Sequence, residues 1–325
     1  MSEVRHGSRI LAARVSILVG VLLLGVKWTA YLLTGSLAML SDALESVVHV
    51  GATGLMYWCL KLSQTPPDEE HPYGHGRAES LSVGFEGGLV ALTGVGVLYQ
   101  VVASYWRPYE LTSLDLGLWL SGVAAAVNLG LGLWLRHMGR TTRSPILVAD
   151  GAHVLSDVYT SGGALVGLGL VLATGWFWID AAVAAILACF VLVTGLKLVR
   201  EAVGGLMDEV DRPLLEQVVA AINEVRTPEW LDAHNLRLRR AGDRVYVDFH
   251  LVVPAQWTVA KAHQVSEQIE EVVLRRLGHA GAVFVHLDHP ERPEYAALTR
   301  TGGTWPLTVE AATRVEEGPE SAVID

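Results

Sequence analysis

Six long apolar stretches, separated by short polar segments, dominate the first 200 residues of the chain. They lie at about 10–33, 37–60, 81–104, 114–135, 146–173 and 177–199. Each is close to the roughly 20 residues that an α-helix needs to cross a bilayer. The first is too long for a signal peptide and lacks a cleavage site, so we expect it to be a membrane span. The pattern predicts a domain of six transmembrane helices over residues 1–205.

Basic residues predict how these helices are oriented. In the six-span arrangement nearly all of them fall on one side of the membrane: Arg5, Arg9, Lys61, Arg77, Arg136, Arg140, Arg143, Lys197 and Arg200. Only Arg107 falls on the other side. Loops rich in Lys and Arg stay in the cytoplasm. We therefore expect a multi-pass protein of the cell inner (plasma) membrane, with both termini cytoplasmic.

Beyond Arg200 the pattern changes to that of a soluble domain. Residues 213–225 and 259–277 have helical apolar spacing. Residues 235–239 and 245–253 alternate around a hairpin signal at 241–243, and 282–287 is a short final strand. The order predicts a cytoplasmic ferredoxin-like α+β (αββαβ) domain over 206–292, with one sheet packed on one helical layer. Residues 293–325 are polar, acidic and unpatterned, so we expect a disordered tail.

Composition excludes several classes of function. Charged residues make up 18% of the chain, below the roughly 25% of a soluble protein. The net charge of −10 comes mainly from acidic residues after position 200, which argues against nucleic acid as a partner. The two cysteines, Cys59 and Cys189, lie in apolar stretches without Cys-x-x-Cys spacing. A disulfide framework or a thiolate metal site is therefore not expected.

Two of the apolar stretches contain ionisable pairs. "SDALESVVHV" carries Glu45 and His49, and "HVLSD" carries His153 and Asp157. Each pair is four residues apart and so lies on one face of its helix. The second and fifth helices are antiparallel, which puts Glu45 level with Asp157 and His49 level with His153 near mid-bilayer.

Ionisable groups at this depth are costly and usually functional. Two carboxylates and two imidazoles form a four-ligand shell for a divalent cation. The alternative is two independent hydrogen-bonded pairs between helices. Asp42 is either a helper or a structural acid. We expect Glu86, near the cytoplasmic end of its helix, to reach the membrane interface instead of binding metal.

Two further groups of potential ligands lie outside the membrane. The loop "TPPDEEHPYGHGRAES" brings Asp68, His71 and His75 together among Pro and Gly turn residues, a set that suits a surface Zn²⁺ site. A solvated acidic loop would explain its acidic residues equally well. In the soluble domain the potential ligands are His234, His250, His263, His286 and Asp288. Isolated strand histidines are usually structural, so periodicity alone favours that interpretation.

Together these features resemble the cation diffusion facilitator transporters, and most closely their bacterial ferrous-iron/zinc efflux type. The resemblance rests on the paired motifs of the second and fifth helices, on "HPYGHGRAE" and on the αββαβ module, and it covers about residues 10–290. It implies a homodimeric antiporter, not an enzyme, that exchanges cytoplasmic Zn²⁺ or a related dication (Mn²⁺, Fe²⁺ or Cd²⁺) for external protons.

The resemblance also implies roles for the candidate residues. Glu45, His49, His153 and Asp157 would form the transport site, and Asp68, His71 and His75 a loop site. A binuclear cytoplasmic site would use His234, His250, His263, His286 and Asp288. Arg77 and Asp208 would form an ion pair that stabilises the dimer. One departure stands out, because related transporters usually have Asp or His where this chain has Glu45, and Asp where it has His49.

That departure leaves manganese or ferrous iron open as the cargo beside zinc, although the two imidazoles favour zinc. Two other classes fit less well. An intramembrane metalloenzyme would need a motif such as His-Glu-x-x-His, which the sequence lacks. A haem-binding cytochrome would have axial histidines without neighbouring acids, so Glu45 and Asp157 argue against it.

Overall fold

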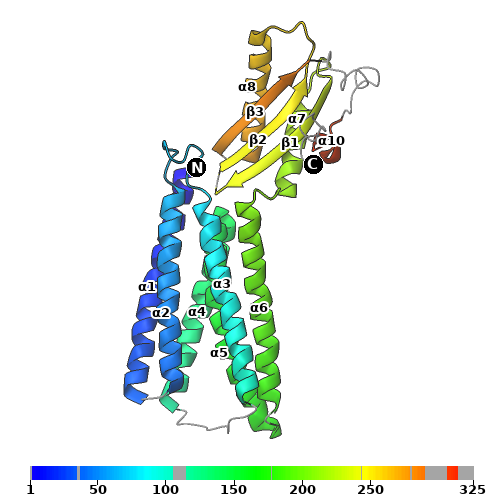
Figure 1. Cartoon of the computed structure of the whole chain (residues 1–325). Helices are drawn as coiled ribbons and strands as arrows, with labels where there is room; N and C mark the ends of the chain where they lie inside the picture. The colour runs from blue at the N-terminus through cyan, green and yellow to red at the C-terminus, as the bar shows by residue number, and fades with distance from the viewer. Residues whose placement is uncertain are drawn as a thin grey trace, which may run out of the picture. The chain divides into compact units, whose positions relative to one another are not determined.

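The chain folds into two compact units, Met1–Leu206 and Met207–Asp325 (Figure 1). The structure, a computed structural model, describes residues 2–34, 37–104, 115–176, 178–242, 244–278, 280–289 and 306–313.

The described part of the first unit contains a long helix at each of the six apolar stretches. These helices lie side by side in a bundle (Figure 1): α1 (Ser2–Thr34), α2 (Leu37–Ser63), α3 (Ala78–Ser104), α4 (Asp115–Thr142), α5 (Pro145–Thr174) and α6 (Trp178–Leu206). Three of them contain a described stretch long and apolar enough to cross a membrane: Gly7–Thr29, Ala78–Ala103 and Ala181–Leu206. The first unit is therefore a helical transmembrane domain, in which α1, α3 and α6 are the clear apolar spans.

Helices α3 and α6 pack closely because glycines remove side chains from their contact. A Cβ atom added at Gly195 of α6 would lie 2.4 Å from the backbone nitrogen of Ala91. A Cβ atom added at Gly94 of α3 would lie 2.8 Å from the backbone nitrogen of Leu192. Real Cβ atoms do not approach backbone this closely, so only glycine allows the two helices to touch here.

A buried ion pair connects four helices at the end of the bundle that carries the 64–77 loop. Arg9 of α1 is only 3% exposed. Its Nη1 lies 3.4 Å from Oε1 of Glu79 on α3, and its Nη2 donates to the carbonyl oxygen of Thr142 at 2.6 Å. The hydroxyl of Ser63, the last residue of α2, donates to the same Glu79 oxygen at 3.2 Å. The pair is thus hydrogen-bonded as well as buried, the arrangement in which a buried charge is tolerated.

The second unit has the predicted αββαβ order: α7 (Arg212–Val225), β1 (Asp232–Ala241), β2 (Arg244–Val252), α8 (Val259–Leu277) and β3 (Ala280–Asp288). The sheet order is β1-β2-β3, with β1 and β2 antiparallel and β2 and β3 parallel. Both helices cover the same face of the sheet (Figure 1). The apolar core lies between these layers and includes Ile222 of α7, Phe249 of β2 and Ile269 of α8.

Residues 306–313 correct the expectation of an unpatterned tail. They include the short helix α10 (Val309–Ala312), which Thr308 caps. The side chains of Leu307 and Ala312 belong to the core of the second unit. Asn223 of α7 donates to the carbonyl oxygen of Leu307 and accepts from its backbone nitrogen, both at 2.9 Å. The expectation is wrong for this segment because four apolar side chains, those of Leu307, Val309, Ala311 and Ala312, pack into or against that core.

Candidate metal centres

Two buried imidazoles face each other inside the helical bundle. His49 of α2 is 7% exposed and His153 of α5 is 4% exposed. Their ring centroids are 4.9 Å apart and the ring planes differ by 9°. The predicted pairing of His49 with His153 across antiparallel helices is confirmed.

The surroundings of these rings leave nitrogens without hydrogen bonds. Within the described part of the chain, neither Nε2 of His49 nor Nδ1 of His153 has a hydrogen-bond partner. Gly20 of α1 lies against the first ring, since a Cβ atom added there would be 3.5 Å from Nδ1 of His49. Buried polar atoms are nearly always satisfied in native proteins. Two such nitrogens on stacked rings, without a partner among the described residues, are atoms that a bound ligand would complete.

The acids predicted for this site are placed unequally. The side chains of Glu45 and Asp42 lie outside the described residues. Asp157 is half-buried on α5, one turn beyond His153. The arrangement of all four predicted ligands together therefore stays a prediction.

The position of Glu86 differs from the one that the sequence predicts. Its side chain does not reach the membrane interface: the residue is 1% exposed, and its Oε2 lies 3.7 Å from Nδ1 of His153. It sits eight residues into α3, which starts at Ala78. At about 1.5 Å per residue that is roughly 12 Å from the helix end, farther than a glutamate side chain extends.

Asp150 is a second acid near the site that sequence reasoning missed. It is fully buried on α5 and its Oδ2 accepts from the Ser16 hydroxyl of α1 at 2.7 Å. The available signal was its spacing, because Asp150 is three residues before His153 and so shares its helix face. This acid already has a hydroxyl donor, which distinguishes it from Glu86.

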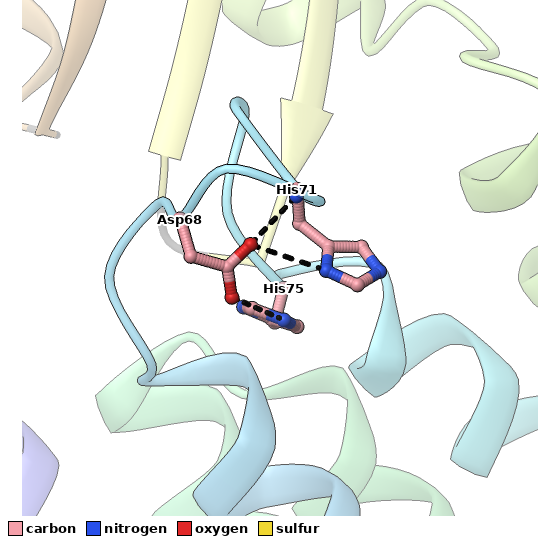
Figure 2. A group of neighbouring side chains, drawn as sticks. All are labelled: Asp68, His71 and His75. Carbon is pink, nitrogen blue, oxygen red and sulfur yellow. Dashed lines mark hydrogen bonds and ion pairs between the residues drawn. The ribbon is translucent and has the colours of Figure 1, made fainter.

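The loop before α3 brings its three predicted ligands together (Figure 2). The candidate ligand atoms of Asp68, His71 and His75 all lie within 4.8 Å of one another. Oδ1 of Asp68 is 3.3 Å from Nδ1 of His71, and Oδ2 is 3.5 Å from Nε2 of His75. The two imidazole centroids are 4.3 Å apart. One carboxylate and two imidazoles in this arrangement suit a surface Zn²⁺ site with positions open to water.

Backbone geometry shapes this loop. Gly74 has φ +78°, a left-handed conformation that favours glycine, and its nitrogen donates to the carbonyl oxygen of His71 at 2.8 Å. The backbone nitrogen of His71 in turn donates to Oδ1 of Asp68 at 2.6 Å. This hydrogen bond, and then the neighbouring imidazoles, hold the pKa of Asp68 below its ordinary value. The carboxylate is thus ionised and ready to bind a cation near neutral pH.

In the second unit three histidines form a row across the sheet. His234 of β1 is paired with His250 of β2, which is paired with His286 of β3. The ring centroids are 5.2 Å apart for the first pair and 4.6 Å for the second. The row lies on the sheet face opposite the core, because side chains alternate and Phe249 and Leu251 on either side of His250 point into the core.

Asp288 completes this cluster from the end of β3. Its Oδ2 is 2.8 Å from Nδ1 of His250, and its Oδ1 is 3.5 Å from Nε2 of His286. Among described residues, His234, His250 and Asp288 have ligand atoms within 4.8 Å of one another. Asn235, at a bulge in β1 with φ +51°, lies 3.2 Å from Nε2 of His250. Strand register therefore brings together ligands that are 54 residues apart in the chain.

His263 is not brought into this cluster. It lies on the exposed face of α8, where its Nε2 is 3.5 Å from Oε1 of Glu267. It does line the same 470 Å³ cavity as Asp288. Of the five predicted ligands, three converge, His286 adjoins them through Asp288, and His263 stands apart.

Arg77 and Asp208 belong to different units of the structure, so their predicted ion pair stays a prediction. Asp208 has φ +57°, an uncommon conformation for a residue with a side chain, in the turn that follows α6.

Comparison with known proteins supplies the context for these centres. Residues 13–207 match the family model described as "Cation efflux transmembrane domain". Residues 210–290 match "Cation efflux protein, cytoplasmic domain". The chain is 36% identical over 271 residues to "Uncharacterized transporter sll1263" of Synechocystis, covering 83% of this chain and 87% of that protein.

A second group of relatives carries a functional name. The chain is 30% identical over 270 residues to "Cation-efflux pump FieF" of Klebsiella pneumoniae, covering 82% of this chain and 88% of that protein. The corresponding protein of Cronobacter sakazakii is 30% identical over 284 residues, covering 85% of this chain and 91% of that protein. The family models and these relatives show that the chain belongs to the cation diffusion facilitator family of cation efflux transporters, with a membrane-embedded domain and a cytoplasmic dimerisation domain.

Proposed function

We propose that this transporter exports a divalent cation from the cytoplasm in exchange for protons, and that His49, His153, Asp157 and Glu45 bind the cation in transit. The observation that carries the proposal is the stacked pair of buried imidazoles, each with one ring nitrogen that has no hydrogen-bond partner among the described residues. In a membrane domain, a buried polar pair of this kind is costly unless it serves a ligand.

The charge of the site fits a dication. Asp157 and Glu45 supply two negative charges, which offset the two positive charges of the ion at low dielectric. Neutral imidazoles add donor atoms without adding charge. Together the four groups form a complete shell for an ion that crosses the membrane without its hydration water.

Proton coupling follows from the same ligands. A bound cation keeps imidazoles and carboxylates deprotonated, and its release lets them take up protons again. The protonated site would then return to the cytoplasmic side while the helices alternate between two arrangements around it. Uptake of metal by inside-out vesicles should therefore be accompanied by proton release from the vesicle lumen, which a trapped pH-sensitive dye can follow.

The proposed topology has six spans in the inner membrane and both termini in the cytoplasm. It is supported by six long helices and by basic residues that fall almost entirely on one side. In this orientation the loop centre and the second unit both lie on the side from which the cation is taken.

We propose that the loop centre and the row of histidines bind accessory metal ions. The donor sets fit Zn²⁺, because each combines imidazoles with a carboxylate at short separation. In the second unit His286 and, on closure of the cavity, His263 would extend the cluster to a binuclear site. Metal bound there would stabilise the homodimer, together with an ion pair between Arg77 and Asp208.

Zinc is the first cargo to test because imidazole nitrogens suit it better than they suit harder ions. Manganese, ferrous iron and cadmium are the alternatives within the same function. Initial rates of uptake into vesicles, measured for each ion in turn, rank them directly.

The site assignment is tested by replacing one imidazole. We expect His153→Ala to reduce zinc flux into proteoliposomes by more than about tenfold. Loss of a residue that only orients a metal ligand already lowers metal affinity or activity about 10–100-fold, and loss of the ligand itself should cost at least as much. His137→Ala, at an exposed position of α4, is the matched control and should transport as the unmodified protein does. Unchanged flux in His153→Ala would refute the site.

A further inference from the structure

The transport site as proposed does not use the buried carboxylate on α3. Glu86 is 1% exposed, and within the described residues neither of its oxygens has a hydrogen-bond partner. Its Oε2 faces Nδ1 of His153, which has no hydrogen-bond partner among those residues either. A buried carboxylate without donors is among the costliest arrangements in a protein interior, so something must compensate it.

The distance between these two atoms matches a shared ion. Oε2 of Glu86 and Nδ1 of His153 are 3.7 Å apart, too far for a hydrogen bond. Carboxylate oxygens and imidazole nitrogens bind a metal at about 2.1 Å, so two ligands of one ion can be at most about 4.2 Å apart. The observed spacing leaves room for an ion that contacts both atoms.

Asp150 is a buried acid in the same region whose hydrogen bonding can be compared with that of Glu86. It is as deeply buried as Glu86, yet its Oδ2 accepts a 2.7 Å hydrogen bond from Ser16. The helices thus provide a hydroxyl for one acid and leave the other facing an imidazole nitrogen. One oxygen of Asp150 is therefore satisfied by packing, whereas both oxygens of Glu86 are without a hydrogen-bond partner among the described residues, and a bound cation would compensate them.

We propose that Glu86 is a fifth ligand of the transported cation, supplied by α3, and that it allows the site to accept harder, six-coordinate ions such as Mn²⁺ beside zinc. The inference rests on the proposed transport site. With Glu86 the proposed site would offer three carboxylates and two imidazoles, of which the described structure brings Glu86 and His153 within reach of one ion. Carboxylate oxygens and higher coordination numbers suit Mn²⁺, whereas four ligands satisfy zinc.

The neighbouring acids are consistent with this arrangement. Asp150 and Asp157 both interact electrostatically with Glu86. Two acids within electrostatic range of Glu86, beside two imidazoles, favour the binding of a cation in a water-poor environment. A dication placed between Glu86 and His153 would be attracted by all three.

The test compares Mn²⁺ and Zn²⁺ transport by the full-length protein in proteoliposomes. Glu86→Gln keeps the shape of the side chain and removes its charge and one ligand oxygen. We expect it to raise the KM for Mn²⁺ at least tenfold while the KM for Zn²⁺ rises less than threefold. Retained zinc transport also shows that the variant is folded. Asp150→Asn is the matched control, since it removes an equally buried charge but no proposed ligand, and it should change the Mn²⁺/Zn²⁺ ratio less than threefold.

Three outcomes would overturn the inference: no Mn²⁺ transport by the unmodified protein, an unchanged metal ratio in Glu86→Gln, or an equal change in Asp150→Asn. If Glu86→Gln loses transport of both ions, Glu86→Asp decides. This variant keeps the charge but shortens the reach by one methylene, so Mn²⁺ transport should still fall more than Zn²⁺ transport, and equal losses would refute the ligand role. The proposed function fails separately, if His153→Ala transports normally.

Discussion

The histidines of the candidate centres differ in burial. His49 and His153 are enclosed in the bundle, and His234 is fully buried in the second unit, whereas His71 is exposed on the loop. Sequence spacing was enough to predict the pairing across α2 and α5, because an i,i+4 motif fixes a helix face. It could not predict the place of Glu86, since that depends on how deeply α3 is inserted and which neighbour it faces. A single glutamate in an apolar stretch carries no such information.

The loop centre predicts a pH dependence with a definite sign. The pKa of Asp68 is lowered in the folded loop. The stabilisation that its carboxylate gives the folded loop is therefore fully present above the ordinary carboxylate pKa, near 4. It is lost only as pH falls through the lower pKa of the folded state. Between about pH 5.5 and 7.5 the carboxylate therefore stays ionised. Imidazoles bind metal only when neutral, and histidines generally gain a proton in this range. We expect the zinc affinity of the loop to fall at least tenfold from pH 7.5 to 5.5.

Calorimetric titration of the full chain, with His153→Ala and His250→Ala removing the other two centres, measures this affinity. Asp68→Asn should weaken binding at both pH values, because a neutral amide replaces the carboxylate. Affinity that is flat with pH would show that His71 and His75 are not ligands.

The arrangement of the helices depends on small residues as much as on apolar ones. The apolar pattern predicted each helix of the bundle and the αββαβ order, since both periodicities are strong. It placed the ends of several helices too early: α2 continues to Ser63 and α6 to Leu206, because polar residues extend a helix into water. Which helices touch was not predictable, because close approach requires glycines on two facing helices to meet, as Gly87 of α3 and Gly195 of α6 do.

We expect Gly195→Ala to destabilise the bundle by about 1–3 kcal/mol, the usual cost of overpacking, because the new Cβ atom would lie 2.4 Å from the Ala91 backbone. Gly88→Ala, on α3 with no heavy atom within 4 Å of the new Cβ, is the control and should be neutral or stabilising. Thermal unfolding in detergent, followed by tryptophan fluorescence, compares the two. Equal melting temperatures would contradict the close α3–α6 contact.

At the scale of the whole molecule, the chain combines a helical membrane unit and a cytoplasmic unit, each with its own candidate metal centres. The row of histidines in the second unit was predictable only as a set of residues, because its geometry depends on strand register and on the bulge at Asn235. The segment 306–313 was missed since a few apolar residues in a polar tail give no sustained periodic signal. Because this segment packs against α7, the second unit extends to at least residue 313.

The proposed transport depends on the paired imidazoles of α2 and α5 as ligands of the cation. Equilibrium zinc binding tests it most directly, in a full-length protein whose loop and cytoplasmic ligands are replaced by His71→Ala, His75→Ala, His250→Ala and Asp288→Ala. We expect one zinc ion per chain, lost when His153→Ala is added and retained when His137→Ala is added. One ion bound with unchanged affinity in the presence of His153→Ala would contradict it.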